Sequence, residues 1–342
     1  MKRIVLFAFA FGIAPAHASF VGFDIPGGGT QDGKGTYVNG INLEGAVTGN
    51  VIGSSGATSG FVRQPNGDVV TFNAATGADT HAIDISFAGV QTGYYTGDDA
   101  HNHGFTRSLA GEIVSFDPKH STGTQAISVN RHGEVGGQYS DERGLQRGFL
   151  RKLDGRVETF DGNPNAQTFG TFVTGISTAR NISGFWFDGA SAMHGFLRFR
   201  NGVVSQIDIE GAGSGALQGT QVESLNTMGD AAGFYTDSGG KRHGFVRTHG
   251  GKIETFDAPG AVNTIVASIN RARDVAGYFT DAQGVAHGFL RKAHGRFKTF
   301  DAPGASLKPS RGTFVSDLND FDTVTGEVFD EQFGAHGFTG NP

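Results

Sequence analysis

The sequence predicts an all-β protein, a seven-bladed β-propeller with four antiparallel strands in each blade. Three observations lead to this prediction. Four sequence landmarks recur seven times, their spacing is constant within each repeat, and the chain opens with the strand that its last repeat lacks. Repeats that hold four short strands in roughly 40–50 residues match propeller blades in size.

The landmarks follow one another in the same order in every repeat. The first is an Asn-type position, at Asn42, Ser86, Asn130, Ser177, Asn226, Asn270 and Asn319. The second is a glycine, at Gly49, Gly93, Gly137, Gly184, Gly233, Gly277 and Gly326. The third is the Phe of a Gly-Phe pair, at Phe61, Phe105, Phe149, Phe196, Phe245, Phe289 and Phe338. The fourth ends a Phe-Asp pair or its variant, at Asp24, Asn73, Asp117, Asp161, Asp208, Asp257 and Asp301.

The constant spacing indicates tight hairpins. The first landmark precedes the second by 7 residues, and the second precedes the Gly of Gly-Phe by 11. The Phe of Gly-Phe precedes the Phe of Phe-Asp, or Ile207 in one copy, by 11 residues. A slip of one residue would turn a strand's buried face outward. Only the segment from Phe-Asp to the next Asn varies, between 13 and 18 residues, so it is expected to be the loop between blades.

The last hairpin of each blade is expected to turn at a glycine six residues after the Phe of Gly-Phe. Asn66-Gly67, Asp154-Gly155 and Asn201-Gly202 occupy this place, and such pairs are typical of two-residue type I′ turns. A turn centred there places the third-strand Phe directly opposite the fourth-strand Phe. Cross-strand aromatic pairs of this kind add on the order of 0.5–1 kcal/mol each.

The two ends of the chain are predicted to share one blade. A lone fourth-type strand, Phe20 to Asp24, precedes six full repeats, and the chain closes with three strands that end at His336-Gly337-Phe338. In a ring, the N-terminal strand completes the last blade and removes an exposed edge. We therefore expect Phe23 to lie beside Phe338. The alternative, an open β-solenoid, would need a separate cap at each end.

Residues 1–18 are predicted to be a secretory signal peptide, and residues 19–342 a single propeller domain. Two basic residues precede the apolar run Ile4 to Ala14, and Ala16-His17-Ala18 has the small-x-small pattern of a cleavage site. The run is much shorter than the ~20 residues of a membrane span. We expect an exported monomer, periplasmic or extracellular, that does not span a membrane.

Composition and missing motifs exclude several classes of function. Without Lys2 and Arg3 the mature chain holds 25 Lys and Arg against 33 Asp and Glu, a net charge of −8. An acidic chain without a basic cluster is unsuited to nucleic-acid binding. There is no cysteine, which excludes disulfides and thiol catalysis. No Gly-x-Ser-x-Gly, His-Glu-x-x-His or P-loop motif occurs, and we expect neither a cofactor nor a metal.

The full repeat joins His-Gly-Phe-Leu-Arg to Thr-Phe-Asp-Ala-Pro-Gly-Ala, Ile-Asn and Val-Ala-Gly-Tyr. It resembles the HAF repeat of bacterial probable extracellular proteins over nearly all of the mature chain. The resemblance implies export and a repeat architecture, and it implies no activity or catalytic residue. Some copies depart from the pattern, since Ser59 and Arg147 replace the His and Asn73 replaces the Asp. The signatures of WD-repeat and kelch propellers are missing, so their functions are not transferred.

Repeated polar residues are candidates for both structural and functional roles. One position holds His103, His194, His243, His287 and His336. Equivalent positions in different blades point around a circle and cannot share one ion's shell of ~2.0–2.2 Å, so a structural hydrogen-bonding role is expected. The loop between the second and third strands holds Asp141, Asp188, Asp237, Asp281 and Asp330. Asx-type turns are expected there, with ligand or weak cation binding as alternatives, although calcium requires six to eight oxygens.

A second repeated position, on the third strand, holds Arg63, Arg107, Arg151, Arg198, Arg247 and Arg291. These arginines are expected to pair with a carboxylate or carbonyl between blades, with anion binding as the alternative. Trp186 is the one tryptophan, and it lies near Phe169, Phe172, Phe187 and Met193. It is expected either to pack between blades or to stack on a sugar or a partner.

The longest loops, residues 25–40, 162–175, 209–224 and 302–317, are predicted to share one face with the loops between second and third strands. Function on a rigid scaffold concentrates in such loops. The leading hypothesis is a non-catalytic binding or interaction module that takes a glycan or a protein on this face. The alternative is a secreted polysaccharide hydrolase or lyase with an acidic site near the central opening, but spacing alone selects no carboxylate pair.

Overall fold

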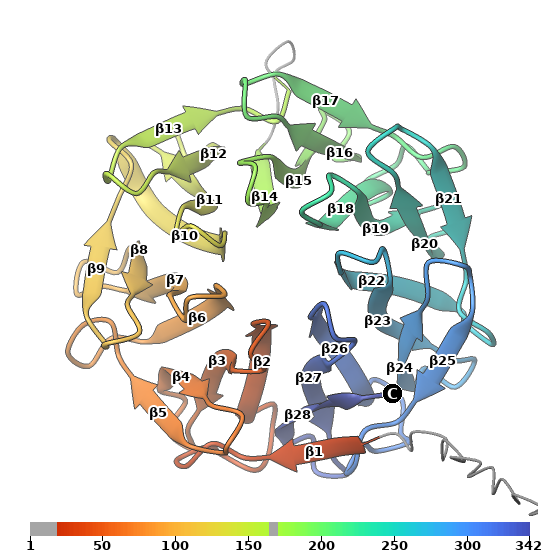
Figure 1. Ribbon diagram of the computed structural model, residues 1–342, viewed down its shortest axis with the longest axis horizontal. Coiled ribbons are helices and arrows are strands. Elements are labelled where there is room, and N and C mark those ends of the chain that lie inside the picture. Colours follow the sequence, from red (N-terminus) through yellow and green to blue (C-terminus); the bar gives the residue numbers. More distant parts are fainter. Residues whose placement is uncertain (1–18, 164–169) are drawn as a thin grey trace, which may run out of the picture.

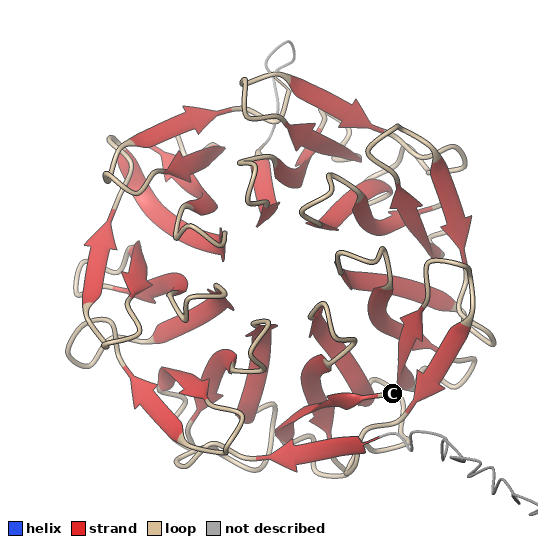
Figure 2. Ribbon diagram, viewed as in Figure 1, coloured by secondary structure: helices blue, strands red, loops and turns tan. Residues whose placement is uncertain are grey.

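The computed structural model describes residues 19–163 and 170–342, and within them every regular element is a β-strand (Figure 2). The predicted signal peptide and Phe169 lie outside the described residues. The 28 strands of the described chain pair as seven antiparallel units of four. These units stand around a central opening, with one strand of each unit nearest the axis and another at the periphery (Figure 1).

The strands occupy four positions from the axis outward. The inner strands are β2 (Gly35–Ile41), β6 (Thr80–Ile85), β10 (Ser121–Val129), β14 (Thr171–Ile176), β18 (Gly219–Leu225), β22 (Asn263–Ile269) and β26 (Gly312–Leu318). The second strands are β3 (Val47–Ile52), β7 (Gln91–Thr96), β11 (Val135–Asp141), β15 (Ile182–Phe187), β19 (Ala231–Thr236), β23 (Val275–Thr280) and β27 (Val324–Phe329). The third strands are β4 (Thr58–Arg63), β8 (Asn102–Arg107), β12 (Gln146–Arg151), β16 (Met193–Arg198), β20 (Arg242–Arg247), β24 (Ala286–Arg291) and β28 (Ala335–Asn341). The outer strands are β5 (Val69–Phe72), β9 (Ile113–Phe116), β13 (Val157–Phe160), β17 (Val204–Ile207), β21 (Ile253–Phe256), β25 (Phe297–Phe300) and β1 (Ser19–Phe23).

Unit 7 is built from both ends of the chain. Units 1 to 6 are β2–β5, β6–β9, β10–β13, β14–β17, β18–β21 and β22–β25, and unit 7 is β26–β28 with β1. β1 runs antiparallel to β28, from Ser19 opposite Asn341 to Phe23 opposite Gly337. The predicted pairing of the two termini is confirmed, but Phe23 lies opposite Gly337 rather than opposite Phe338.

The turn before each outer strand explains this difference of one residue. In unit 6 the N–H of Gly295 donates to the carbonyl of Lys292 (2.8 Å), and the N–H of Lys292 donates to the carbonyl of Arg296 (2.9 Å). Gly295 has a φ of +91°. One positive φ after a type I turn defines a three-residue loop with a G1 bulge. The prediction of a two-residue type I′ turn is therefore wrong. That turn needs positive φ at both central residues, whereas in Asn66-Gly67 and its equivalents only the glycine has positive φ.

The longer turn places each outer-strand Phe over the Gly of Gly-Phe. Phe300 lies opposite Gly288, and a Cβ built on Gly288 would come within 2.5 Å of the Phe300 ring. The predicted pair of Phe residues within one unit is therefore not formed. The outer-strand Phe instead meets the third-strand Phe of the next unit edge to face, at centroid distances of 5.8 to 6.4 Å in five interfaces. Such contacts add to the burial of both rings.

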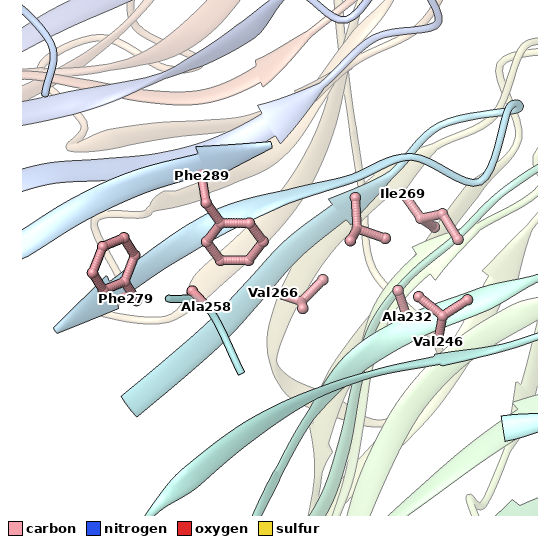
Figure 3. Packing of buried hydrophobic residues seen from close by; sticks show 8 residues of the cluster. Ala232, Val246, Ala258, Val266, Ile269, Phe279 and Phe289 are labelled. Carbon is pink, nitrogen blue, oxygen red and sulfur yellow. The ribbon is translucent and has the colours of Figure 1, made fainter. Parts of the chain in front are cut away.

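The hydrophobic core lies between neighbouring units. One cluster joins Ala232 and Val246 of unit 5 to Val266 and Phe289 of unit 6 (Figure 3). The third-strand Phe of every unit is completely buried. Full burial of such a side chain stabilises the fold by about 1.5–3 kcal/mol, so packing between units replaces the disulfides that the chain lacks.

Each inner strand contains a β-bulge that brings it close to the second strand. In unit 6 the register shifts between Val266 and Ser268. A Cβ built on Gly277 would lie 2.0 Å from the carbonyl oxygen of Ile265. The second sequence landmark is therefore glycine because the bulged backbone leaves no room for a side chain.

The loops between units lie beside the turns that join second and third strands. Three long ones span residues 24–34, 208–218 and 301–311, and the fourth long connection joins Phe160 to Thr171. The last five or six residues of each predicted long loop therefore belong to an inner strand. The first long loop bridges two units, since Gly29 N–H donates to Ile52 O (2.9 Å) and Gly33 N–H donates to Phe333 O (2.8 Å). The prediction that the long loops share one face with the turns between second and third strands is therefore confirmed for this loop. Within the described residues no helix is long and apolar enough to cross a membrane.

Candidate functional site

The repeated histidine forms an Asp–His–Asp clamp, in which one imidazole lies between two carboxylates. In unit 6 the His287 Nδ1 lies 2.7 Å from Asp301 Oδ1, and its Nε2 lies 3.3 Å from Asp281 Oδ2. The first Asp follows the outer strand, and the second belongs to the turn between second and third strands. The same clamp is centred on His103, His194, His243, His287 and His336.

In units 2, 6 and 7 the clamp favours the charged imidazole. A carboxylate only accepts hydrogen bonds, so both ring nitrogens donate together only in the imidazolium. Burial lowers the pKa of His287, but its hydrogen bonds to Asp301 and Asp281 outweigh this effect and raise that pKa. Hydrogen bonding to Asp117 is the largest cause of the raised pKa of His103. Because both nitrogens are engaged, neither is free to act as a base or as a metal ligand.

Two units build the clamp from other side chains. In unit 3 the Arg147 Nε lies 2.8 Å from Asp141 Oδ2, and its Nη1 lies 2.8 Å from Asp161 Oδ1. In unit 1 Ser59 Oγ lies 3.0 Å from Asn73 Oδ1. Three chemistries therefore fill one structural position, which confirms the structural role predicted for the histidines.

The predicted aspartates between second and third strands also hold their own turns. Asp281 Oδ1 accepts the N–H groups of Gln283 and Val285, both at 2.9 Å, which confirms the expected Asx-type turn. The same two backbone contacts are made by Asp141, Asp188, Asp237 and Asp330. Their other oxygen faces the clamp histidine or arginine, so both oxygens of each carboxylate already have a partner within the scaffold. Sequence comparison missed Asp99, which enters the clamp of His103 from two residues further along its turn.

Trp186 is buried at 4 % exposure and is stacked on the His194 imidazole, with centroids 4.3 Å apart. Tyr95, Tyr235 and Phe279 cover the clamp histidines of their own units in the same way. Trp186 therefore packs inside the scaffold and offers no open face for a sugar, which corrects its selection as a ligand-binding candidate.

The repeated arginine lies between units, as predicted, but its main partner is an aromatic ring. The Arg291 guanidinium lies 4.5 Å from the ring centroid of Phe256 in the preceding unit. Equivalent contacts join Arg63 to Phe23, Arg107 to Phe72, Arg151 to Phe116 and Arg198 to Phe160. The predicted carboxylate appears as an additional partner for Arg291, from Glu254, and for Arg198, from Glu158 at 3.9 Å. A cation over a ring contributes on the order of 0.5–2 kcal/mol.

A hollow with a volume of about 1060 Å³ lies at the rim of unit 3. It lies beside residues 117–120, the shortest connection between two units, at a place that longer connections occupy in other units. Many of its charged side chains pair with one another, such as Arg147 with Asp141 and His120 with Glu142 (2.9 Å). Internal pairing leaves this hollow with few groups that lack a partner.

The axial channel contains a chamber of about 190 Å³ formed by the inner-strand bulges. Its lining includes the bulged residue of all seven units, namely Asn39, Ile83, Ile127, Thr174, Glu223, Ala267 and Ser316. Asp84 and Asp317 line the same chamber. The sequence predicted acidic residues near the axis without identifying any of them. Asp84 and Asp317 could not be selected because the equivalent position holds Ser or Gly in the other units.

The channel carboxylates cross-link neighbouring units. Asp84 Oδ2 accepts from Ser128 Oγ and from the Val129 N–H, both at 2.9 Å. Asp317 Oδ2 accepts the Ile41 N–H at 2.9 Å, across the junction of units 7 and 1. Burial and the nearby charge of Asp84 raise the pKa of Asp317 to about 7, and burial raises the pKa of Glu223 to about 7. Within the described residues no three His, Asp or Glu side chains are grouped to hold a metal ion.

The channel widens on the face of the turns that join inner and second strands. We call this hollow, of about 690 Å³, the mouth cavity. All seven units line it, each with the aliphatic end of its inner strand and the residues that follow the Asn-type landmark. These residues include Phe87, Arg131, Met228, Arg271 and Asp320.

No protein-family model and no curated protein matches this chain. Among solved structures, it is similar to the lectin BP39L from Burkholderia pseudomallei, with a TM-score of 0.53 and 12% identity over 90% of this chain and 96% of the lectin. TolB from Acinetobacter baumannii has a TM-score of 0.52 and 12% identity over 75% of this chain and 63% of TolB. A prolyl endopeptidase has a TM-score of 0.56 and 12% identity over 92% of this chain and 47% of the enzyme.

This chain thus spans less than two thirds of the length of TolB and of the prolyl endopeptidase. At 12% identity the likeness concerns the fold alone. An all-β, propeller-like architecture, predicted from the repeats, is confirmed.

Proposed function

We propose that this chain is an exported, non-catalytic binding or interaction module. Its fold would be a single seven-bladed β-propeller, residues 19–342, whose last blade is completed by the N-terminal strand. Support comes from the seven four-stranded units and from the pairing of β1 with β28. The HAF-like repeat and the leader pattern of residues 1–18 support export.

One observation carries the proposal: the repeated polar groups are occupied in holding the scaffold together. Each clamp histidine has a carboxylate on both nitrogens, and the turn aspartates have both oxygens engaged. The hollows of the rim and the axis remain as places for a ligand. A scaffold whose repeated histidines and aspartates hold one another, and that offers hollows beside them, suits binding better than catalysis.

The test is a screen of the purified chain, residues 19–342, on glycan and peptide arrays, together with a polysaccharide panel assayed for product release. We expect binding without turnover. Intact-mass analysis of the exported protein, with a mature N-terminus at Ser19 as the expected result, tests the leader separately. Failure to bind any array ligand, or retention of residues 1–18, would count against the corresponding part of the proposal.

A polysaccharide-active enzyme is the second candidate, and the acidic chamber favours it. Asp317 and Glu223 have pKa values raised to about 7, as a general acid requires. Against this role, Asp84 and Asp317 already accept backbone N–H groups from neighbouring units. Product release that Asp317→Asn abolishes without loss of folding would establish the enzyme and refute the binding module.

A further inference from the structure

We propose that the mouth cavity binds a peptide segment that carries both apolar and acidic side chains. This inference rests on the proposed binding function and specifies its site and ligand class. Three features of the cavity break the symmetry of the seven units, and together they select this ligand.

The first feature is a set of exposed apolar side chains around the opening. Phe87 is 40 % exposed and Met228 is 56 % exposed, and both line the cavity. Phe321, next to the lining residue Asp320, is 68 % exposed. Below them lie buried aliphatic side chains such as Ile85 and Ile269. Large apolar side chains gathered around a hollow are typical of sites that bind apolar groups of a partner.

The second feature is a pair of guanidinium groups without carboxylate partners. Arg131 of unit 3 and Arg271 of unit 6 line the cavity, and neither forms an ion pair within the described chain. The Arg131 guanidinium lies 4.8 Å from the ring centroid of Phe87, so this positive charge stands beside an exposed apolar side chain. In turns of the same type, by contrast, Arg180 pairs with Glu134 (2.8 Å) and Arg273 pairs with Asp230 (3.1 Å). Guanidinium groups bind carboxylates in a bidentate geometry, so acidic side chains complement both sides of the opening.

The third feature is a ring of side-chain hydrogen bonds with two gaps. In five units the landmark Asn donates its Nδ2 to the carbonyl of the equivalent residue in the next unit, as from Asn226 to Asn270 (3.0 Å). Ser86 and Ser177 interrupt the ring because a hydroxyl is too short to span the same distance. The carbonyls of Asn130 and Asn226 thus lack this side-chain donor, although they accept the N–H groups of Gly133 (2.9 Å) and Gly229 (3.2 Å) in their own turns. Each carbonyl oxygen has room for a second donor, and both residues line the cavity.

A peptide combines the groups that these features call for. Its apolar side chains suit Phe87 and Met228, its carboxylates suit the two guanidinium groups, and its backbone N–H groups suit the two carbonyls. A volume of about 690 Å³ lies within the ~300–1,000 Å³ of ordinary ligand sites. A neutral sugar offers no carboxylate, and a nucleic acid offers few apolar groups.

The experiment measures fluorescence anisotropy of three labelled, acetylated hexapeptides with residues 19–342. The first alternates Leu with Glu, the second alternates Leu with Lys, and the third alternates Ser with Glu. We expect the first to bind at least tenfold more tightly than the other two. Comparable affinity for the Lys peptide or the Ser peptide, or binding by none of the three, would overturn the inference.

Variants locate the bound peptide. Met228→Glu and Arg271→Glu are expected to weaken binding of the Leu–Glu peptide at least tenfold. Ser86→Asn, which restores a donor for Asn130, is expected to weaken it without lowering the melting temperature. The matched control is Leu153→Glu, since Leu153 is 64 % exposed on a neighbouring turn and does not line the cavity.

The outcomes separate this inference from the proposed function. Unchanged peptide affinity in both Met228→Glu and Arg271→Glu would overturn the mouth cavity as the site and leave the binding module intact. Binding of an array glycan without any of the peptides would do the same. Turnover of a polysaccharide, in contrast, would refute the binding module itself.

Discussion

At the scale of single residues, the Gly-Phe pair works across two interfaces. The Phe fills the core between units, while the Gly leaves room for the outer-strand ring of its own unit. At Gly288 that ring is Phe300, and its nearest atom lies 2.5 Å from where a Cβ would be. The two residues of this one landmark are thus required for separate physical reasons.

Gly288→Ala should destabilise the protein, because the new methyl group overlaps the Phe300 ring. We expect a loss of about 1–3 kcal/mol in the free energy of unfolding, the usual cost of overpacking. Urea titration followed by intrinsic fluorescence measures it. Gly123→Ala is the matched control, since Gly123 also lies in a strand and a Cβ there meets nothing within 4 Å. Equal losses in both variants would show that close approach does not explain the glycine.

At the scale of elements, hairpin loops of one type join consecutive strands within the units. Their last residue has positive φ, and before the outer strands this residue is always glycine, as at Gly295. The turns between inner and second strands also accept other residues, such as Arg180 and Arg273. The ring is thus assembled by repeating one local geometry, which sets the register of each strand pair.

Gly295→Asn should be tolerated better than Gly295→Val, because Asn adopts positive φ far more readily than a β-branched residue. The expected cost is about 1 kcal/mol for Asn and about 2 kcal/mol or more for Val. A Cβ at this position meets only the flexible end of Arg291, at 3.7 Å, so crowding is the same small factor in both. Differential scanning calorimetry measures the difference, and equal melting temperatures would argue against the G1-bulge geometry.

The sequence repeats were sufficient to predict the strands and loops of each unit. They did not predict the features that depend on contacts between units. Landmark spacing predicted the four-strand units, the phase of the loops and the pairing of β1 with β28. The turn type was wrong by one residue, because Asn-Gly also fits a type I turn with a bulge. The aromatic partner of Arg291 comes from a strand about 35 residues away, and no local pattern reveals it.

The candidate sites were harder to predict than the fold. The aspartates and Trp186 were selected because they recur or stand out, but burial and pairing assign them to the scaffold. The channel acids Asp84 and Asp317 escaped because they replace Ser or Gly at one inner-strand position. Arg131 and Arg271 escaped because only the structure shows that they lack ion-pair partners.

At the scale of the whole molecule, β1 connects three neighbouring units. This strand places Asp24 against His336 (2.7 Å) and Phe23 under Arg63 (4.5 Å), and Phe20 is stacked on Phe300 at 4.8 Å. The last two contacts reach units 1 and 6, so β1 touches both neighbours of its own unit.

Removal of residues 19–24 should lower the melting temperature by about 10 °C, because it exposes the edge of β28 and removes the contacts of β1. Circular dichroism during heating measures the change. Val21→Ser is the control, since Val21 is 53 % exposed and should have little effect. A synthetic peptide of residues 19–24 should restore part of the loss when added to the truncated chain. An unchanged melting temperature in the truncated chain would contradict ring closure by this strand.

Stability should be greatest at mildly acidic pH. The raised pKa values of His103, His287 and His336 give stability that is complete below about pH 6.5 and lost as the pH rises through the folded-state pKa. Asp317 and Glu223, with pKa values raised to about 7, bind more protons in the folded than in the unfolded state between about pH 4 and 7. Their contribution also falls as the pH rises through this interval.

The clamp aspartates set the acidic limit of the pH range in which the fold is most stable. Burial raises the pKa of Asp281, but hydrogen bonds from the Val285 N–H and His287 outweigh it, so that pKa is lowered. The stability that it contributes is lost as the pH falls below about 4. Melting temperatures at constant ionic strength should therefore peak between about pH 4 and 6, and Asp317→Asn should flatten the decline between pH 5 and 8. A melting temperature that rises from pH 6 to 9 would contradict this assignment.

The antiparallel pairing of β1 with β28 also determines how the molecule responds to mechanical force. Ser19 and Asn341, near the two ends of the part of the chain that the structure describes, lie opposite each other at the same end of the ladder. Tension applied through these ends acts on the first pair alone, so the ladder opens like a zipper, one pair after another. Shear loading would strain all five pairs together, but this arrangement does not allow it. Tension between attachments at Ser19 and Asn341 would therefore separate β1 from β28 one residue pair at a time, beginning at Ser19.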